Sequence, residues 1–179
     1  MRIIGGRLKG IQFFAPANLP VRPTTDMAKE ALFNILYNNY DFEECEVLDL
    51  FTGTGSVSFE FASRGAKKIT SVDKHAGCIH WIKSIIAKHN LDEIEPTKAD
   101  VLKFLEQETK QYQIIFADPP YDLPSIPLIP ELVFKNNLLA PNGILVVEHA
   151  TYTKLNQQKG YTHNRKYGNS SFSFFENQE

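Results

Sequence analysis

Short runs rich in apolar and β-branched residues recur along the chain, and amphipathic stretches separate them. The runs at 47–51, 68–72, 112–117 and 143–148 do not alternate between apolar and polar residues. This pattern is typical of strands that are buried on both faces of a sheet. Between them lie stretches with apolar residues at helical spacing, most clearly over 79–90. Strands that alternate with helices predict right-handed crossovers and three αβα layers.

The two ends of the chain follow other patterns. Residues 15–24 contain three prolines and predict an extended arm. Thr24, Thr25 and Asp26 offer N-cap oxygens for a helix that reaches about Tyr37. Residues 171–174 alternate, as an antiparallel edge strand would. We therefore expect a mostly parallel sheet with an antiparallel C-terminal edge, in one domain over 1–179 with 1–24 as an arm.

Composition agrees with a globular protein. Of the 179 residues, 42% are hydrophobic and 22% are charged, which is near the globular average. No apolar run approaches the roughly 18 residues of a membrane span, and the first residues lack the apolar stretch of a signal peptide. The two cysteines exclude a disulfide framework, and the five histidines lack metal-ligand spacing with them. A soluble, cytoplasmic protein without a metal is expected.

Charge is informative by position rather than in total. The formal net charge is −2, yet residues 1–25 and 151–175 contain no Asp or Glu. The cations of these two segments are Arg2, Arg7, Lys9, Arg22, Lys154, Lys159, Arg165 and Lys166. If folding brings the ends together, they predict a basic face for a polyanion. The alternative is that both tails lack acids by chance.

A glycine pair follows the first predicted strand. In doubly wound sheets ligands bind beyond the carboxyl ends of the strands, and Gly53 and Gly55 lie at such an end. Glycine lets the backbone approach a ligand closely. Asp73 ends the next strand, 18 residues beyond Gly55, where it can accept from ribose hydroxyls. Asp100 follows at a plausible third strand end, where a carboxylate can accept from an adenine amino group.

The third glycine of a dinucleotide fingerprint is absent, because Val57 and Ser58 occupy its region. A pyrophosphate cofactor such as NAD is therefore less favoured than S-adenosylmethionine, a nucleoside that carries an amino acid and no phosphate. A purely structural turn is the alternative interpretation of the two glycines.

The sequence Asp118-Pro119-Pro120-Tyr121 directly follows the strand at 112–117. Both prolines lack a backbone N–H and fix the backbone, so acceptors without amide donors can face a pocket. The Asp118 carboxylate and the Pro119 carbonyl can accept the two N–H bonds of an exocyclic amine. Tyr121 can stack on the base. The alternative is a rigid turn with a capping aspartate.

These features together resemble the DPPY-type amino methyltransferases that use S-adenosylmethionine. Further blocks are similar to the RsmD family, namely Arg2–Gly6, Arg22–Asp26, Glu30–Leu36, Ser63–Ala66, Val147–His149 and Arg165–Gly168. The family consists of bacterial 16S rRNA (guanine-966-N2)-methyltransferases with a Rossmann-like fold. Thr52, Val57, Ser58 and Asp73 depart from its usual residues.

The resemblance implies methyl transfer to the exocyclic N2 of a guanine in 16S rRNA of the small ribosomal subunit. The implied catalytic residues are Asp118, Pro119, Pro120 and Tyr121. The implied cofactor-binding residues are Asp49, Phe51, Thr52, Gly53, Thr54, Gly55, Asp73, Lys74, Asp100, Val101, Arg22 and Thr24. Asn34 would also close over the cofactor or the target base. Arg2, Arg7, Lys9, Arg165 and Lys166 are the expected RNA contacts.

The expected partner is 16S rRNA in the 30S subunit or in an assembly intermediate, and the expected state is a monomer without membrane or metal partners. Three other functions remain open. An adenine-N6 methyltransferase on RNA or DNA would need the same acceptors. A protein-glutamine methyltransferase would more usually carry Asn at the position of Asp118. A catalytically silent, nucleoside-binding ribosome-assembly factor would not need the Asp118 carboxylate.

Overall fold

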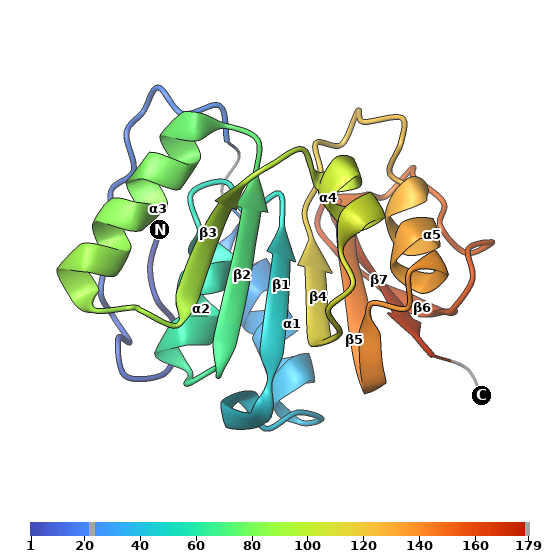
Figure 1. The fold of residues 1–179 in the computed structure, drawn as a ribbon, viewed down its shortest axis with the longest axis horizontal. Helices are drawn as coiled ribbons and strands as arrows, with labels where there is room; N and C mark the ends of the chain where they lie inside the picture. The colour runs from blue at the N-terminus through green and yellow to red at the C-terminus, as the bar shows by residue number, and fades with distance from the viewer. Residues whose placement is uncertain (22–23, 178–179) are drawn as a thin grey trace.

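The computed structural model describes residues 1–21 and 24–177, which form a seven-stranded sheet with the order β3-β2-β1-β4-β5-β7-β6 (Figure 1). The strands are β1 Glu46–Leu50, β2 Lys68–Asp73, β3 Ile94–Lys98, β4 Tyr112–Ala117, β5 Leu139–Ala150, β6 Tyr161–Tyr167 and β7 Ser170–Glu176. The first five strands pair in parallel, and β7 pairs antiparallel with both β5 and β6. The predicted antiparallel C-terminal edge is confirmed.

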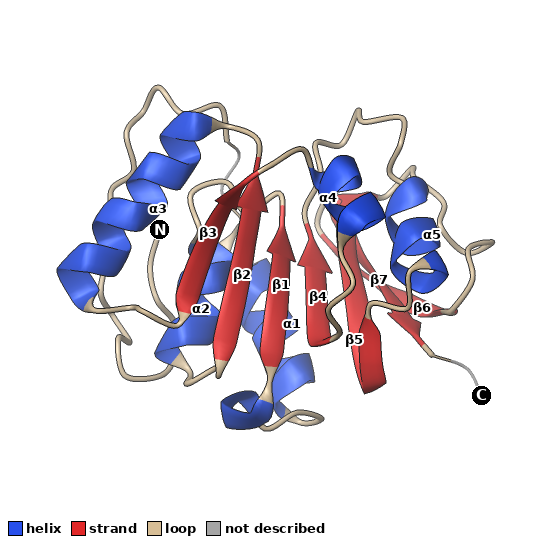
Figure 2. Ribbon diagram, in the orientation of Figure 1, coloured by secondary structure: helices blue, strands red, loops and turns tan. Residues whose placement is uncertain are grey.

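Helices cover both faces of the sheet (Figure 2). They are α1 Asp26–Tyr37, the 3-10 helix η1 Phe42–Glu44, α2 Ser56–Ser63, α3 Ala76–His89, α4 Val101–Gln107 and α5 Leu128–Lys135. One core packs α1, α2 and α3 against one face, and a second core packs α4 and α5 against the other. The predicted αβα sandwich is therefore confirmed, and its reason is the continuous apolar strands that both helical layers cover. Within the described residues no helix is both long and apolar enough to span a membrane.

Some elements lack the pattern that would predict them. All residues of β6 are exposed or half-buried, so this strand shows no apolar face in the sequence. α5 begins after Pro127 and contains Pro130. Proline is compatible with a first helical turn because the N–H groups there have no intrahelical partner. β5 begins at Leu139, four residues before the predicted start at Gly143.

Residues 1–13 double back on themselves at the start of the chain. Arg2 and Gln12 form an antiparallel bridge, and the Phe13 amide donates to the Met1 carbonyl at 2.9 Å. The amides of Ile4 and Gly5 both donate to the Glu60 carboxylate of α2 at 2.9 Å. The start of the chain is thus held against α2.

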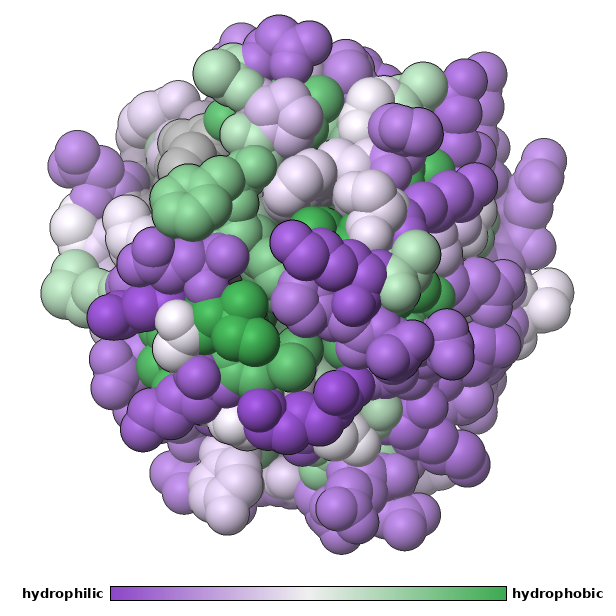
Figure 3. Space-filling model, turned by 90° about the vertical axis from the view of Figure 1, so that its left-hand side faces the viewer, coloured by the Kyte–Doolittle hydropathy of each residue, from purple (hydrophilic) through white to green (hydrophobic). Residues whose placement is uncertain are grey.

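The side of the molecule that Figure 3 shows is mostly hydrophilic, with small apolar patches.

Candidate functional site

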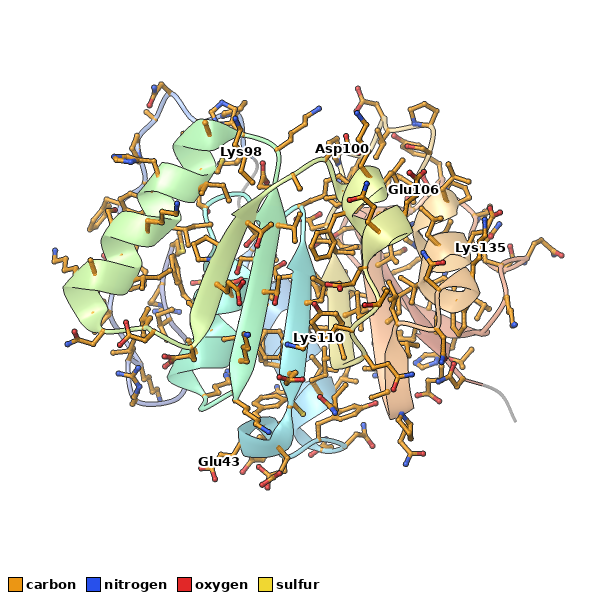
Figure 4. All side chains as sticks on the ribbon, in the orientation of Figure 1. Glu43, Lys98, Asp100, Glu106, Lys110 and Lys135 are labelled. Atoms are coloured by element: carbon orange, nitrogen blue, oxygen red, sulfur yellow. The ribbon has the colours of Figure 1, made fainter. Side chains whose placement is uncertain are left out.

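A cavity of about 440 Å³ opens at the carboxyl ends of the strands. It lies beyond β1 and β4, the neighbouring strands at which the strand order reverses. This is where doubly wound sheets bind ligands. Figure 4 labels Asp100 at this end of the sheet, at the start of α4.

The structure brings most of the predicted site residues into the wall of this one cavity. They are Thr24, Asp49, Phe51, Thr52, Gly53, Thr54, Asp73, Lys74, Asp100, Val101, Asp118, Pro119 and Pro120. Gly55 and Tyr121 are not among the described residues that line it. Asn34 lies elsewhere, in a groove beside β6. Arg22 lies outside the described residues.

The loop after β1 turns through left-handed backbone conformations. Phe51 has a φ of 58° and Gly53 a φ of 58°, followed by Gly55 at 85°. A Cβ on Gly55 would lie 3.0 Å from both Ile82 Cγ1 and Phe59 Cζ. Gly55 is therefore required for close packing of α2 and α3, whereas Gly53 faces the cavity. Phe51 adopts a conformation that costs a non-glycine residue about 1–3 kcal/mol.

Asp73 holds this loop while facing the cavity. Its Oδ2 accepts from the Gly53 amide at 2.9 Å, and its Oδ1 accepts from the His75 amide at 2.9 Å. A carboxylate has about four lone-pair positions, so two acceptor positions remain. Asp73 can therefore accept from the two hydroxyls of a ribose.

Asp49 lies at the base of the same cavity and is almost fully buried. Its Oδ2 accepts from Thr52 Oγ1 at 2.7 Å and from Ser58 Oγ at 2.6 Å. Ser58 Oγ also lies 2.6 Å from Ser71 Oγ. Burial raises the pKa of Asp49 from 3.8 to about 6, although the two hydroxyl bonds oppose the shift.

Asp100 serves as a helix cap. Its Oδ1 accepts from the Lys103 amide at 3.1 Å, which satisfies a free N–H in the first turn of α4. It also lines the cavity. The structure thus adds a capping role, and the contact of Asp100 with an adenine stays a prediction.

Asp118 lies at the end of β4, beside the arm. Its amide donates to the Leu50 carbonyl at 3.2 Å, which joins the ends of β4 and β1. Thr24 Oγ1 donates to Asp118 Oδ2 at 3.5 Å. Pro20 and Val21 of the arm also line the cavity. The arm therefore forms one wall of the site.

Sequence reasoning missed several lining residues, which are mostly apolar or small. They are Pro20, Val21, Ser56, Val57, His75, Cys78, Leu102, Phe116, Leu123 and Ser125. Leu123 and Ser125 directly follow the Asp-Pro-Pro-Tyr block, and this nearness was a usable signal. His75 Nδ1 accepts from the Cys78 amide at 3.3 Å, so His75 caps the start of α3.

The five expected RNA contacts do not share one face. Arg7 pairs with Glu93 at 3.4 Å, just before the edge strand β3. Arg165 and Lys166 lie on β6, the opposite edge of the sheet. Arg2 pairs with Asp26 at 3.2 Å, and Lys9 is exposed. The condition set by the sequence, that folding brings the basic ends together, is not met for Arg7 and Arg165.

Comparisons with known proteins concern the family and the fold. Residues 1–176 match a family model described as "Conserved hypothetical protein 95". The chain is 34% identical over 152 residues to "Ribosomal RNA small subunit methyltransferase D" of Haemophilus influenzae, a match covering 83% of this chain and 78% of that protein. These matches confirm the family resemblance drawn from the sequence.

Solved structures show the same fold. A "Putative methyltransferase yhhF from Escherichia coli" has a TM-score of 0.84 and 25% identity, covering 98% of this chain and 96% of its own. The Thermus thermophilus "16S rRNA N2 G1207 methyltransferase (RsmC) in complex with AdoMet and Guanosine" has a TM-score of 0.70 at 20% identity, covering 89% of this chain and 45% of its own. The second likeness concerns the fold alone.

Proposed function

Because the chain belongs to the family of ribosomal RNA small subunit methyltransferase D, we propose that it methylates 16S rRNA with S-adenosylmethionine. The acceptor is the exocyclic N2 of a guanine. One observation carries the proposal: Asp118 and Pro119 line the same cavity as Gly53 and Asp73. Acceptors for an amine and acceptors for a ribose therefore share a single pocket.

The residues present fit S-adenosylmethionine. The cavity of about 440 Å³ lies within the roughly 300–1,000 Å³ range of small-molecule pockets. The remaining acceptor positions of Asp73 suit the ribose, and Asp100 suits the adenine amino group. Phe51 to Thr54 would hold the amino-acid end. When bound, the cofactor supplies a methyl group activated by its sulfonium.

The chain's own groups act on the amine. Asp118 accepts a hydrogen bond from the guanine NH2, and the Pro119 carbonyl accepts the other. Both bonds localise the nitrogen lone pair and stabilise the positive charge that develops as the nitrogen–carbon bond forms and the sulfur–carbon bond breaks. Asp118 can then accept the proton that the nitrogen releases. Tyr121 remains a proposed stacking partner of the base, and its hydroxyl is buried.

The direct test is transfer of tritiated methyl groups to naked 16S rRNA, to 30S subunits and to genomic DNA, followed by nucleoside analysis. We expect N2-methylguanosine in the small-subunit RNA. N6-methyladenosine would establish the adenine alternative. Cofactor binding without transfer to any nucleic acid would favour the silent assembly factor.

Asp118→Ala tests the catalytic assignment. We expect methyl transfer to fall at least about 100-fold, because one preorganised acceptor is lost. Cofactor affinity, measured by calorimetry, should stay nearly unchanged. Asp122→Ala is the matched control, since Asp122 is an exposed carboxylate of the same loop that does not line the cavity. Equal loss of transfer and cofactor binding would make Asp118 a structural residue.

Arg2, Arg7, Lys9, Arg165 and Lys166 remain the proposed RNA contacts. Arg7→Gln combined with Lys9→Gln should weaken binding of 16S rRNA. The slope of log affinity against log salt should flatten by about 1.4, or roughly 0.7 for each phosphate contact. Lys103→Gln with Lys135→Gln removes the same charge from α4 and α5, which cover the other face of the sheet from the N-terminal segment. An unchanged salt slope would remove Arg7 and Lys9 from the interface.

A further inference from the structure

An open groove of about 400 Å³ lies between α1 and the edge strand β6. On the α1 side it is lined by Asn34, Asn38 and Asn39, and on the β6 side by Arg165 and Tyr167. The methyl-transfer site described above uses none of these residues. The groove therefore needs an explanation of its own.

The groove carries an available cation. Arg165 is exposed, and within residues 1–21 and 24–177 no ion pair or hydrogen bond engages its guanidinium. Arg2 and Arg7, in contrast, each face a carboxylate. A free guanidinium can bind a phosphate through two parallel hydrogen bonds.

The other groups suit nucleotide bases. Asn34 and Asn38 are exposed amides, each of which offers both donors and an acceptor to a base edge. The ring of Tyr167 lies 5.4 Å from that of Phe172, which fixes it in place while it remains half-exposed. A fixed aromatic ring is a platform on which a base can stack. Phosphate, base edge and base face thus each have a partner.

The groove also lies level with the catalytic pocket. Arg165 pairs with Phe172, and Phe172 pairs with Glu148. Glu148 directly follows Val147, which pairs with Ala117, the residue before Asp118. Arg165 is therefore three strands from Asp118 at nearly the same height, a separation of roughly 14 Å at about 4.8 Å for each strand. Neighbouring nucleotides of one RNA strand can span that distance.

Alternation along β6 separates its two proposed RNA contacts. Arg165 and Tyr167 face the α1 side of the sheet and line the groove. Lys166 lies between them and projects to the opposite side. The charge of β6 is thus divided between two faces, and only one of these faces adjoins α1.

We propose that the groove between α1 and β6 binds single-stranded RNA next to the target guanine, with Arg165 on a phosphate and Tyr167 and the asparagines on a base. This inference rests on the proposed function. It extends that function by proposing where the RNA next to the target guanine binds, outside the catalytic pocket. An unstacked single strand fits because its bases expose both edges and faces.

The test measures binding of a naked 16S rRNA transcript and methyl transfer to it for Arg165→Gln and Asn34→Ala. Arg165→Gln should weaken binding about fivefold at 0.1 M salt, the factor implied by one lost single-strand phosphate contact. Asn34→Ala should weaken binding without changing the salt slope, because it removes no charge. Both variants should raise KM for RNA while leaving cofactor affinity unchanged.

Two matched controls lie on the other face of the sheet. Lys135→Gln removes a cation from α5, where Figure 4 labels Lys135, and Gln107→Ala removes an amide from α4. Both should leave RNA binding unchanged. Lys166→Gln should have a smaller effect than Arg165→Gln. Equal effects of Lys166→Gln and Arg165→Gln would show that β6 attracts RNA only by its overall positive charge. That result would overturn the proposal.

The outcomes distinguish the inference from the function on which it rests. If the wild-type protein methylates no RNA, the proposed function fails. If it methylates 16S rRNA and the groove variants match the controls, only the groove proposal fails. If the variants bind naked RNA normally but fail on 30S subunits alone, the groove contacts protein, and the RNA proposal is again overturned.

Discussion

The buried carboxylates of Glu60 on α2 and Asp49 on β1 differ in whether a cation lies beside them. Glu60 lies within 3.5 Å of Lys29 Nζ and 2.7 Å of Arg64 Nε, and it accepts two backbone amides of the N-terminal segment. Asp49 has no cation beside it among the described residues and accepts hydrogen bonds from hydroxyls. Both side chains are almost fully buried.

The partners of these two acids explain what each does. Glu60 joins α1, α2 and the start of the chain, because Lys29 Nζ also donates to the Arg2 carbonyl at 2.6 Å. It therefore stabilises the elements from which the arm reaches Asp118. Asp49 lines the cavity, and burial, with a smaller contribution from the charge of Asp73, raises its pKa to about 6, where proton uptake is accessible. A buried acid beside cations stabilises the fold, whereas a buried acid without a neighbouring cation makes the stability of the protein depend on pH.

The largest expected effect is that of Glu60→Gln. The substitution leaves Lys29 buried without its carboxylate, which costs about 3–5 kcal/mol of unfolding free energy. Chemical denaturation measures the loss. Lys29→Met combined with Glu60→Gln should recover part of it, because the fully buried ammonium is removed together with its carboxylate. A loss below about 1 kcal/mol, with no recovery in the double variant, would show that the pair does not anchor the arm.

Asp49→Asn tests whether the buried Asp49 carboxylate makes the stability of the protein depend on pH. The pKa of Asp49 is raised from 3.8 to about 6 in the folded protein, so folded chains bind more protons than unfolded chains between these values. Stability contributed by this group is therefore highest at low pH and falls as pH rises through 6. By pH 7 the accumulated cost is about 3 kcal/mol, from about 1.36 kcal/mol for each pKa unit.

Asn cannot ionise, so the stability of Asp49→Asn relative to the wild type should rise by up to about 3 kcal/mol between pH 4 and pH 7. Urea denaturation at several pH values measures this difference. Asp41→Asn is the control, because Asp41 is exposed and caps a 3-10 helix. A difference that stays flat with pH would contradict a raised pKa at Asp49.

The smallest effect is expected for Ser58→Ala. It removes the 2.6 Å hydrogen bond to Asp49 Oδ2, and bonds to charged groups contribute about 1.5–3 kcal/mol. The cost should be larger at pH 7 than at pH 4, since the protonated carboxyl needs the donor less. Ser84→Ala, which removes an exposed hydroxyl from α3, is the control. Equal costs at both pH values would show that the Ser58 hydroxyl does not stabilise the charged form of Asp49.

Much of the candidate site could be predicted because its parts are local in sequence. The glycine pair, Asp73 and the Asp118 block each follow an apolar strand, and the carboxyl ends of parallel strands share one edge. Gly55 shows the limit of this reasoning. Its place beside Gly53 suggested ligand contact, but its lack of a Cβ serves packing against Ile82 and Phe59.

The sequence by itself determined the layered sheet and the acids at its carboxyl edge, because both depend on patterns within a few residues. Only the tertiary structure decided which charges are paired. Lys29 and Glu60 come from two different helices, α1 and α2, and Arg7 and Glu93 are 86 residues apart. Such partners follow from strand order and helix packing, so identical side chains can stabilise the fold in one place and remain available to RNA in another.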